Sequence, residues 1–448
     1  MNLSRQLGID KTVLAMLFSR AWTLLSSPIT ILLTASCLTS IEQGYYYVFS
    51  SILGAAVFLE FGLAVVIGQF VSHEMAAIKW THGSIPTGNC IAIDRLASLF
   101  QLGVTWYSAV AVLVLIVILP GGYYYLGLSS QNRNVSWEAP WVLIAFAGAV
   151  NFAISPIVCT IEGAGFIEKT SFYRLVQAIV ATLTLWIGLL LHLRLFALPL
   201  MSLSSVIIIA VFVYKDWRDS ISFLVTRNSR SSSISYFRDV LPLHFQTALS
   251  WLSGYLIFSL CTPIIFSSNS DQAVIDAGKY GLTVSLLLNL IAVSQIWITK
   301  SMPETGRLIA CKQFDKADRL FVENSVRALV INVSCTFALN LVLWFLVYYE
   351  SPISSRLLSP FDFFILSSSW VFGNFIAILS QYTRSYKKDP LSYLAVASGV
   401  CIVLCAYMLM PQFGLTGVVL SQFVVQVLAV VIALPKVVRL RTVWQRDR

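Results

Sequence analysis

Charged residues are scarce in this chain of 448 residues. Lys, Arg, Asp and Glu make up 11% of it, whereas hydrophobic residues make up 57%. Soluble domains contain about a quarter charged residues, so the composition excludes an ordinary soluble protein. The deficit extends along the whole length and leaves apolar stretches of 20 or more residues. Because such stretches satisfy their backbone in lipid only as helices, the sequence predicts an all-α polytopic membrane protein.

Cysteine and histidine are too few and too scattered to mark a site by their spacing. The chain has eight cysteines and four histidines, with no CxxC pair and no Cys–His cluster. A disulfide framework and a zinc site are therefore not predicted. Nucleophile, phosphate-loop and nucleic-acid-binding motifs are missing as well. We expect no enzyme activity, no nucleic-acid partner and no cofactor, and we leave coupling to H⁺ or Na⁺ open.

The apolar stretches predict twelve transmembrane helices in two groups of six. A polar, serine-rich segment separates the groups and reads as a cytoplasmic linker at 215–237. We therefore predict two pseudo-symmetric six-helix lobes, at 1–214 and 238–448. The predicted spans are 12–38, 44–72, 97–119, 139–161, 172–192, 195–214, 240–266, 279–299, 325–348, 361–382, 391–410 and 414–434.

Basic residues fix the orientation of these spans. With both termini inside, 25 of the 30 Lys and Arg residues fall in cytoplasmic segments, four fall in outer loops, and Arg20 falls within the first span. Positive charge accumulates on the cytoplasmic side of membrane proteins, so this split predicts cytoplasmic N- and C-termini. The net charge of +9 then lies at the membrane surface.

The two halves resemble each other at the start of their second helices. Residues 41–53 read IEQGYYYVFSSIL and residues 275–287 read IDAGKYGLTVSLL. Each stretch has an acid, a glycine, a tyrosine and then an apolar run with small polar residues. Paired halves are typical of transporters whose site lies between two repeats.

A polar face runs along the first span. Arg20, Thr23, Ser27, Thr30 and Thr34 follow a helical spacing on one side. Lipid offers these groups no partners, so the face must meet another helix or water. Packing through small hydroxyl residues and the wall of a polar cavity are both open readings, and the arginine favours the cavity.

Glu60 lies inside the apolar run of the second span. Counted from an outer tyrosine belt at Tyr45–Tyr47, it lies roughly 20 Å deep at 1.5 Å per residue. Arg20 lies about 13 Å from the inner face, a depth that agrees with that of Glu60 within roughly 5 Å. Each charge alone would cost about 2.5 to 3.5 kcal/mol in the membrane. We therefore predict an Arg20–Glu60 ion pair, which is either structural or part of a coupling mechanism.

Further polar residues lie on the seventh, eighth and tenth predicted spans. Histidine within a span is more often packed than functional, so packing stays an alternative for the one found here. We predict that these side chains contribute to a binding cavity: His244, Thr247, Trp251, Asn289, Lys300 and Asn374.

Residues 42–63, EQGYYYVFSSILGAAVFLEFGL, resemble the second-helix region of polysaccharide-biosynthesis membrane proteins. These are the O-antigen (Wzx-type) flippases of the MOP (multidrug/oligosaccharidyl-lipid/polysaccharide) exporter superfamily. Two looser matches are EGAGFIEK at 162–169 and PQFGLTGVVLSQ at 411–422. The layout of twelve spans in two halves is similar too.

This resemblance implies a flippase of the bacterial cytoplasmic (inner) membrane that works by alternating access. Its cargo would be a polyprenyl-diphosphate-linked oligosaccharide for O-antigen, capsule or exopolysaccharide synthesis. Lipid II flippases, which are similar, bind the diphosphate through cavity arginines, and Arg20 fits that role. Membrane lipids, a polysaccharide polymerase and glycosyltransferases are the implied partners. The residues that suit sugar or phosphate contacts are Thr23, Ser27, His244, Thr247, Trp251, Asn289, Lys300 and Asn374.

Two alternatives remain. A cation-coupled multidrug exporter of the same superfamily would need an acidic cavity for cationic cargo. A membrane polysaccharide polymerase would need a sizeable outer loop with catalytic residues, whereas the longest predicted outer loop covers only 120–138. The charges within the spans favour an anionic cargo and hence the flippase.

Overall fold

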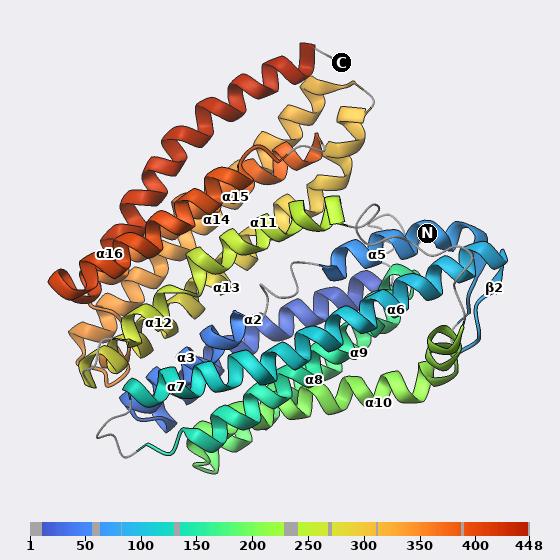
Figure 1. Cartoon of the computed structure of the whole chain (residues 1–448). Coiled ribbons are helices and arrows are strands. Elements are labelled where there is room, and N and C mark those ends of the chain that lie inside the picture. Colours follow the sequence, from blue (N-terminus) through green and yellow to red (C-terminus); the bar gives the residue numbers. More distant parts are fainter. Residues whose placement is uncertain are drawn as a thin grey trace, which may run out of the picture. The chain divides into compact units, whose positions relative to one another are not determined.

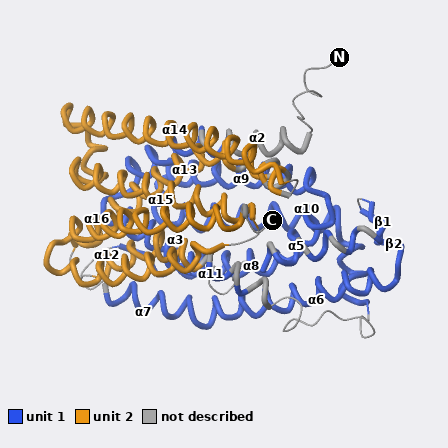
Figure 2. Tube along the Cα trace, turned by 90° about the horizontal axis from the view of Figure 1, so that it is seen from above, with its two compact units in different colours: residues 1–251 blue, residues 252–448 orange. Residues whose placement is uncertain are grey.

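The computed structural model describes residues 11–55, 63–81, 83–129, 135–227, 241–267, 271–310, 312–386 and 389–446. The described chain is helical except for one short hairpin, which confirms the predicted all-α membrane fold (Figure 1). It divides into two compact units, residues 1–251 and 252–448 (Figure 2). The predicted linker beyond residue 227 lies outside the described residues.

The first unit holds the first six predicted spans. Within it, α9 packs between α2 and α10, while α8 contacts α10, α6 and α5. A hairpin of two strands, pairing Ile78 with Gly88, connects the second and third spans. The elements are α2 (Lys11–Cys37), α3 (Ser40–Gly54), α5 (Leu63–Glu74), η1 (Met75–Ala77), β1 (Ile78–Lys79), β2 (Thr87–Gly88), α6 (Cys90–Leu113), the π-turn η2 (Val114–Ile118), α7 (Leu119–Ser129), α8 (Glu138–Gly163), α9 (Ile167–Leu190), η3 (Arg194–Phe196) and α10 (Ala197–Thr226).

The second unit holds the remaining spans. Its main contacts join α13 to α14 and α15, and α15 to α16. Helix α11 begins before the unit boundary and ends within this unit. The elements are α11 (Leu241–Phe258), α12 (Cys261–Phe266), α13 (Asp271–Ala310), α14 (Phe314–Tyr348), η5 (Ser354–Arg356), α15 (Pro360–Ser385) and α16 (Ser392–Arg446).

Eight described helices are long and apolar enough to cross a membrane. One of them, α16, contains both predicted spans 11 and 12. The two spans meet at Gly414, where the backbone is non-helical (φ +58°, ψ −145°), a conformation that favours glycine. The predicted spans 1, 2 and 7 correspond to α2, to α3 with α5, and to α11 with α12. Helix α2 is 27 residues long, whereas the described parts of spans 2 and 7 each comprise two helices.

Several helices extend beyond their predicted limits. The third span was expected to end at 119, and instead the helix continues as α7 to Ser129, so the predicted outer loop at 120–138 is partly wrong. Pro120 is accommodated directly after the π-turn η2, and the Trp141 indole donates to the Leu119 carbonyl at 2.9 Å. Helix α10 continues twelve residues past the expected end at 214, to Thr226.

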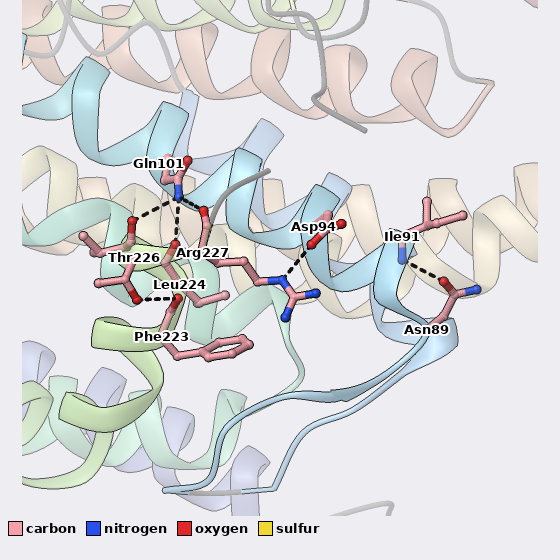
Figure 3. Close-up of polar contacts among 9 residues, drawn as sticks. Asn89, Ile91, Asp94, Gln101, Phe223, Leu224, Thr226 and Arg227 are labelled. Carbon is pink, nitrogen blue, oxygen red and sulfur yellow. Dashed lines mark hydrogen bonds and ion pairs between the residues drawn. The ribbon is translucent and has the colours of Figure 1, made fainter. Parts of the chain in front are cut away.

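Side chains of α6 hold the C-terminal end of α10 (Figure 3). The Gln101 amide nitrogen lies 3.0 Å from the Leu224 carbonyl and 2.9 Å from the Arg227 carbonyl. The Arg227 guanidinium contacts the Asp94 carboxylate at 2.6 Å. The last carbonyls of a helix lack partners within the helix, so these contacts explain why α10 stays ordered to its end.

The second unit repeats this contact. Arg441, near the end of α16, lies 2.5 Å from Asp318, near the start of α14. Tyr382 of α15 also donates a hydrogen bond to Asp318. Both acids begin an Asp-Arg-Leu triplet, at 94–96 and at 318–320. The third and ninth helices therefore hold the sixth and twelfth in the same way, which supports the predicted internal repeat.

Candidate functional site

A small polar pocket lies inside the first unit, between α5, α8, α9 and α10. Its volume is about 290 Å³. Polar side chains are prominent in its lining, although the surrounding helices are transmembrane spans. Polar groups within spans are expensive and therefore mark candidate functional sites. The pocket residues are Ala64, Asn151, Ile154, Ser155, Val158, Cys159, Arg174, Gln177 and Ile209.

The residues EGAGF at 162–166 form the turn between α8 and α9, the two helices that supply most of the pocket lining. Glu162 and Gly163 end α8, and a Cβ atom on Gly163 would lie 2.7 Å from the Gly68 carbonyl oxygen. Glycine at 163 therefore lets α5 and α8 approach closely below the pocket. Phe166 then packs edge-on against Trp80 and Trp217, which anchors the turn into α9.

Arg174 carries the positive charge of the pocket. Its Nε donates to Glu162 Oε1 at 2.9 Å, and the two side chains are 55% and 32% exposed. A guanidinium has five N–H donors, and this bond uses one of them. Helical side chains lean toward the N-terminus of their helix, which for α9 is the cytoplasmic end. The arginine therefore leans toward the side from which a cytoplasmic ligand would enter.

Amide and hydroxyl groups complete the polar lining. Gln177 donates to the Ser205 hydroxyl at 2.8 Å, and Ser155 donates to the Asn151 carbonyl of its own helix at 3.0 Å. Arg174 lies seven residues after the first residue of α9, which is about 10 Å along the helix. Asn151 lies about 18 Å from the end of α8 by the same measure. The pocket residues therefore lie about 10 to 18 Å from the joined ends of α8 and α9.

Sequence reasoning missed Arg174 because it placed the start of the fifth span at 172. That limit left the arginine at the membrane surface, where it counted as a cytoplasmic charge. The structure starts α9 at Ile167, so Arg174 lies two turns inside the helix. The signal was present in the sequence, since Arg174 and Gln177 have the i, i+3 spacing of one helix face.

The polar face of α2 divides into two parts. Thr30 accepts a hydrogen bond from the Trp186 indole of α9 at 2.8 Å, and Thr34 donates to the Thr30 carbonyl at 2.6 Å. These outer residues fit the packing reading. Thr23 is exposed in this unit and Ser27 is half-buried, and their role in lining a cavity stays a prediction. Arg20 lies on the same helix, but its side chain is outside the described residues.

The predicted Arg20–Glu60 ion pair remains a prediction. Glu60 lies in the stretch 56–62, which the structure does not describe. The same holds for the side chains of His244, Thr247 and Trp251 on α11 and of Lys300 on α13. Their helices are described, and they place the first three residues on α11 within the first unit.

Asn374 and Asn289 belong to the second unit and differ in their surroundings. Asn374 is 1% exposed, accepts from Gln295 at 2.6 Å and donates to Ser294 at 3.0 Å. Gln381 extends this network by donating to Gln295 at 2.7 Å. The network joins α13 to α15, which is a packing role. Asn289 is half-buried and donates to the Ser285 carbonyl of its own helix at 2.9 Å.

Within the described residues, no group of three or more His, Cys, Asp or Glu side chains is placed to hold a metal ion. Asp216 and Glu323 lie ten and nine residues from the nearer ends of α10 and α14, whereas other described carboxylates lie at helix ends. Glu42 is an example, since it caps α3 by accepting from the Thr39 amide at 2.9 Å and lies 3.4 Å from Arg194.

Comparison with known proteins gives matches at the level of structure. No protein-family model and no curated protein sequence matches this chain. Several solved structures match nearly the whole chain, including the following three. Lipid II flippase MurJ in an inward closed conformation has a TM-score of 0.66 at 12% identity, over 95% of this chain and 87% of MurJ. A MOP superfamily transporter from Pyrococcus furiosus has a TM-score of 0.61 at 14% identity, over 97% of this chain and 95% of that transporter. An inward-facing MATE multidrug resistance transporter of the MOP superfamily has a TM-score of 0.58 at 14% identity, over 92% of this chain and 99% of the transporter.

The chain has the MOP-superfamily fold. Within this fold, the three stretches that carry the resemblance have defined structural roles. Residues 42–53 begin α3 with the capping glutamate and bury Tyr45, which stacks on Trp137 at a ring distance of 6.3 Å. Tyr45 is thus packed rather than part of an exposed belt. Residues 411–422 contain the interruption at Gly414.

Proposed function

We propose that this protein flips a polyprenyl-diphosphate-linked oligosaccharide across the bacterial cytoplasmic membrane, by alternating access, for surface polysaccharide synthesis. The observation that carries the proposal is the distribution of charge in the described spans. Arg174 lies two turns inside α9 and lines a polar pocket, and no carboxylate is among the described residues that line this pocket. A phosphate needs cations and N–H donors, and arginine matches phosphate oxygens with a planar fork.

The fold supports the proposal, because one of the similar structures is a lipid II flippase. It is equally compatible with a multidrug exporter, since MATE transporters match over similar lengths. A cationic drug would need carboxylates in its binding site, and the described lining of this pocket contains an arginine and no carboxylate. The charge pattern therefore favours a phosphate-bearing cargo.

A deletion strain tests this proposal. We expect lipid-linked oligosaccharide to accumulate in the cytoplasmic leaflet while surface polymer disappears, and the mass of the extracted lipid would identify the sugar. Normal surface polymer together with altered sensitivity to cationic dyes would contradict the proposal and indicate the drug exporter. Unpolymerised units in the outer leaflet would indicate a polymerase instead.

A further inference from the structure

We propose that the pocket between α5, α8, α9 and α10 is a phosphate-binding site in which Arg174 exchanges its contact with Glu162 for a phosphate oxygen. The inference rests on the proposed function only for the source of the phosphate, which is either the diphosphate headgroup of a lipid or a free phosphate ion. The chemistry of the pocket is the same for both.

The size and lining of the pocket suit a phosphate group. Ligand pockets range over about 300–1,000 Å³, and this one, at about 290 Å³, lies at the lower end. It can hold one or two phosphates but not a whole oligosaccharide. Arg174, Asn151 and Gln177 bring a guanidinium and two amides to one space, from two different helices. These groups all provide N–H donors, and the charged oxygens of a phosphate accept hydrogen bonds.

Glu162 acts as an internal substitute for the ligand. An arginine within a span is costly without a partner. In the described structure Glu162 supplies that partner, and the contact is only half-buried. An ion pair this exposed contributes little net free energy, so an incoming phosphate can replace the carboxylate at small cost. The carboxylate lies at the cytoplasmic end of α8, where water can solvate it after release.

This arrangement makes opposite predictions for the two partners of the pair. Neutralising Arg174 removes the cation, so phosphate should bind more weakly. Neutralising Glu162 removes the competitor, so phosphate should bind more tightly. A purely structural ion pair would not give opposite signs, because both changes would simply loosen the contact between α8 and α9.

The test measures binding to the purified full-length protein and to its variants in lipid nanodiscs. The probes are inorganic pyrophosphate, undecaprenyl diphosphate and, as an uncharged lipid, undecaprenol. We expect Arg174→Gln to weaken diphosphate binding at least tenfold, the factor typical of a lost charge-assisted contact. Arg174→Lys, which keeps the charge without the fork, should bind with intermediate affinity. Glu162→Gln should strengthen binding about two- to fivefold, which corresponds to losing a partly exposed ion pair.

Arg95→Gln and Glu74→Gln are matched controls. Their 3.7 Å pair lies in the same unit, and the Arg95 side chain has a similar exposure, 51%, but neither residue lines the pocket. These variants should bind diphosphate like the unmodified protein. Binding of pyrophosphate alone would identify a free oxyanion as the ligand, and binding of undecaprenyl diphosphate alone would identify the headgroup.

Two results would overturn the inference. One is unchanged diphosphate binding by Arg174→Gln in a variant that elutes and melts like the unmodified protein. The other is weaker binding by Glu162→Gln. Either result leaves the lipid analysis of the deletion strain untouched, so failure of this inference is distinguishable from failure of the proposed function.

Discussion

Polar residues within the spans of this protein are of two kinds. Some hold helices together, as Asn374 does between α13 and α15 and as Thr30 does between α2 and α9. Others line a space, as Arg174 and Asn151 do. Residue type and helical spacing do not separate the two kinds, because both satisfy their polar groups away from lipid. The distinction depends on what faces each side chain, which only the packed structure shows.

Asn374→Leu should therefore destabilise the protein. The substitution removes the acceptor of Gln295 and the donor to Ser294 in a site that is 1% exposed. Leaving a buried polar group without a partner costs about 1 to 3 kcal/mol. Thermal unfolding of the purified protein should show a clear drop in melting temperature. Asn151→Leu is the matched control, because Asn151 is exposed to the pocket and its loss should change the melting temperature much less. Equal melting temperatures for the two variants would contradict this view.

At the scale of elements, the ends of the last helix in each unit depend on an Arg–Asp contact. Asp94 holds α10 and Asp318 holds α16. The span limits predicted from hydropathy missed both extensions, because these segments are polar and are stabilised by neighbouring helices rather than by lipid. The repeated Asp-Arg-Leu triplet was the available sequence signal.

Removing either contact should loosen only its own helix end. Asp94→Asn should accelerate hydrogen exchange of the amides near 220–227, and Asp318→Asn those near 440–446. A hydrogen bond to a charged group contributes about 1.5 to 3 kcal/mol, which corresponds to roughly 10- to 100-fold faster exchange. Mass spectrometry of the exchanged protein measures both segments in each variant. Faster exchange at both ends in a single variant, or at neither, would show that the contacts are not local clamps.

At the scale of the whole molecule, composition was sufficient to predict the all-α membrane fold, whereas the orientation and the twelve-span layout stay predictions. The periodicity of apolar residues and the positive-inside bias depend on the solvent and hold without knowledge of packing. The candidate site was less predictable. Arg174 was placed at the surface by a span limit five residues too late, and the predicted partner of Arg20, Glu60, lies outside the described residues. A shift of a few residues along a helix axis moves a charge by several ångströms, enough to change its assignment from surface to membrane.

Reconstitution measures whether the protein moves a diphosphate-linked glycan lipid across a bilayer. Purified protein would be placed in vesicles that carry a polyprenyl diphosphate bearing a fluorescent sugar, and a membrane-impermeant reductant would quench the outer leaflet. We predict that the unmodified protein and Arg95→Gln move the fluorescent lipid from the inner leaflet to the outer leaflet, where the reductant quenches it. Arg174→Gln should lower the rate of this quenching at least tenfold. If the same fraction of the lipid is quenched in vesicles with and without the protein, the proposed flippase function is contradicted.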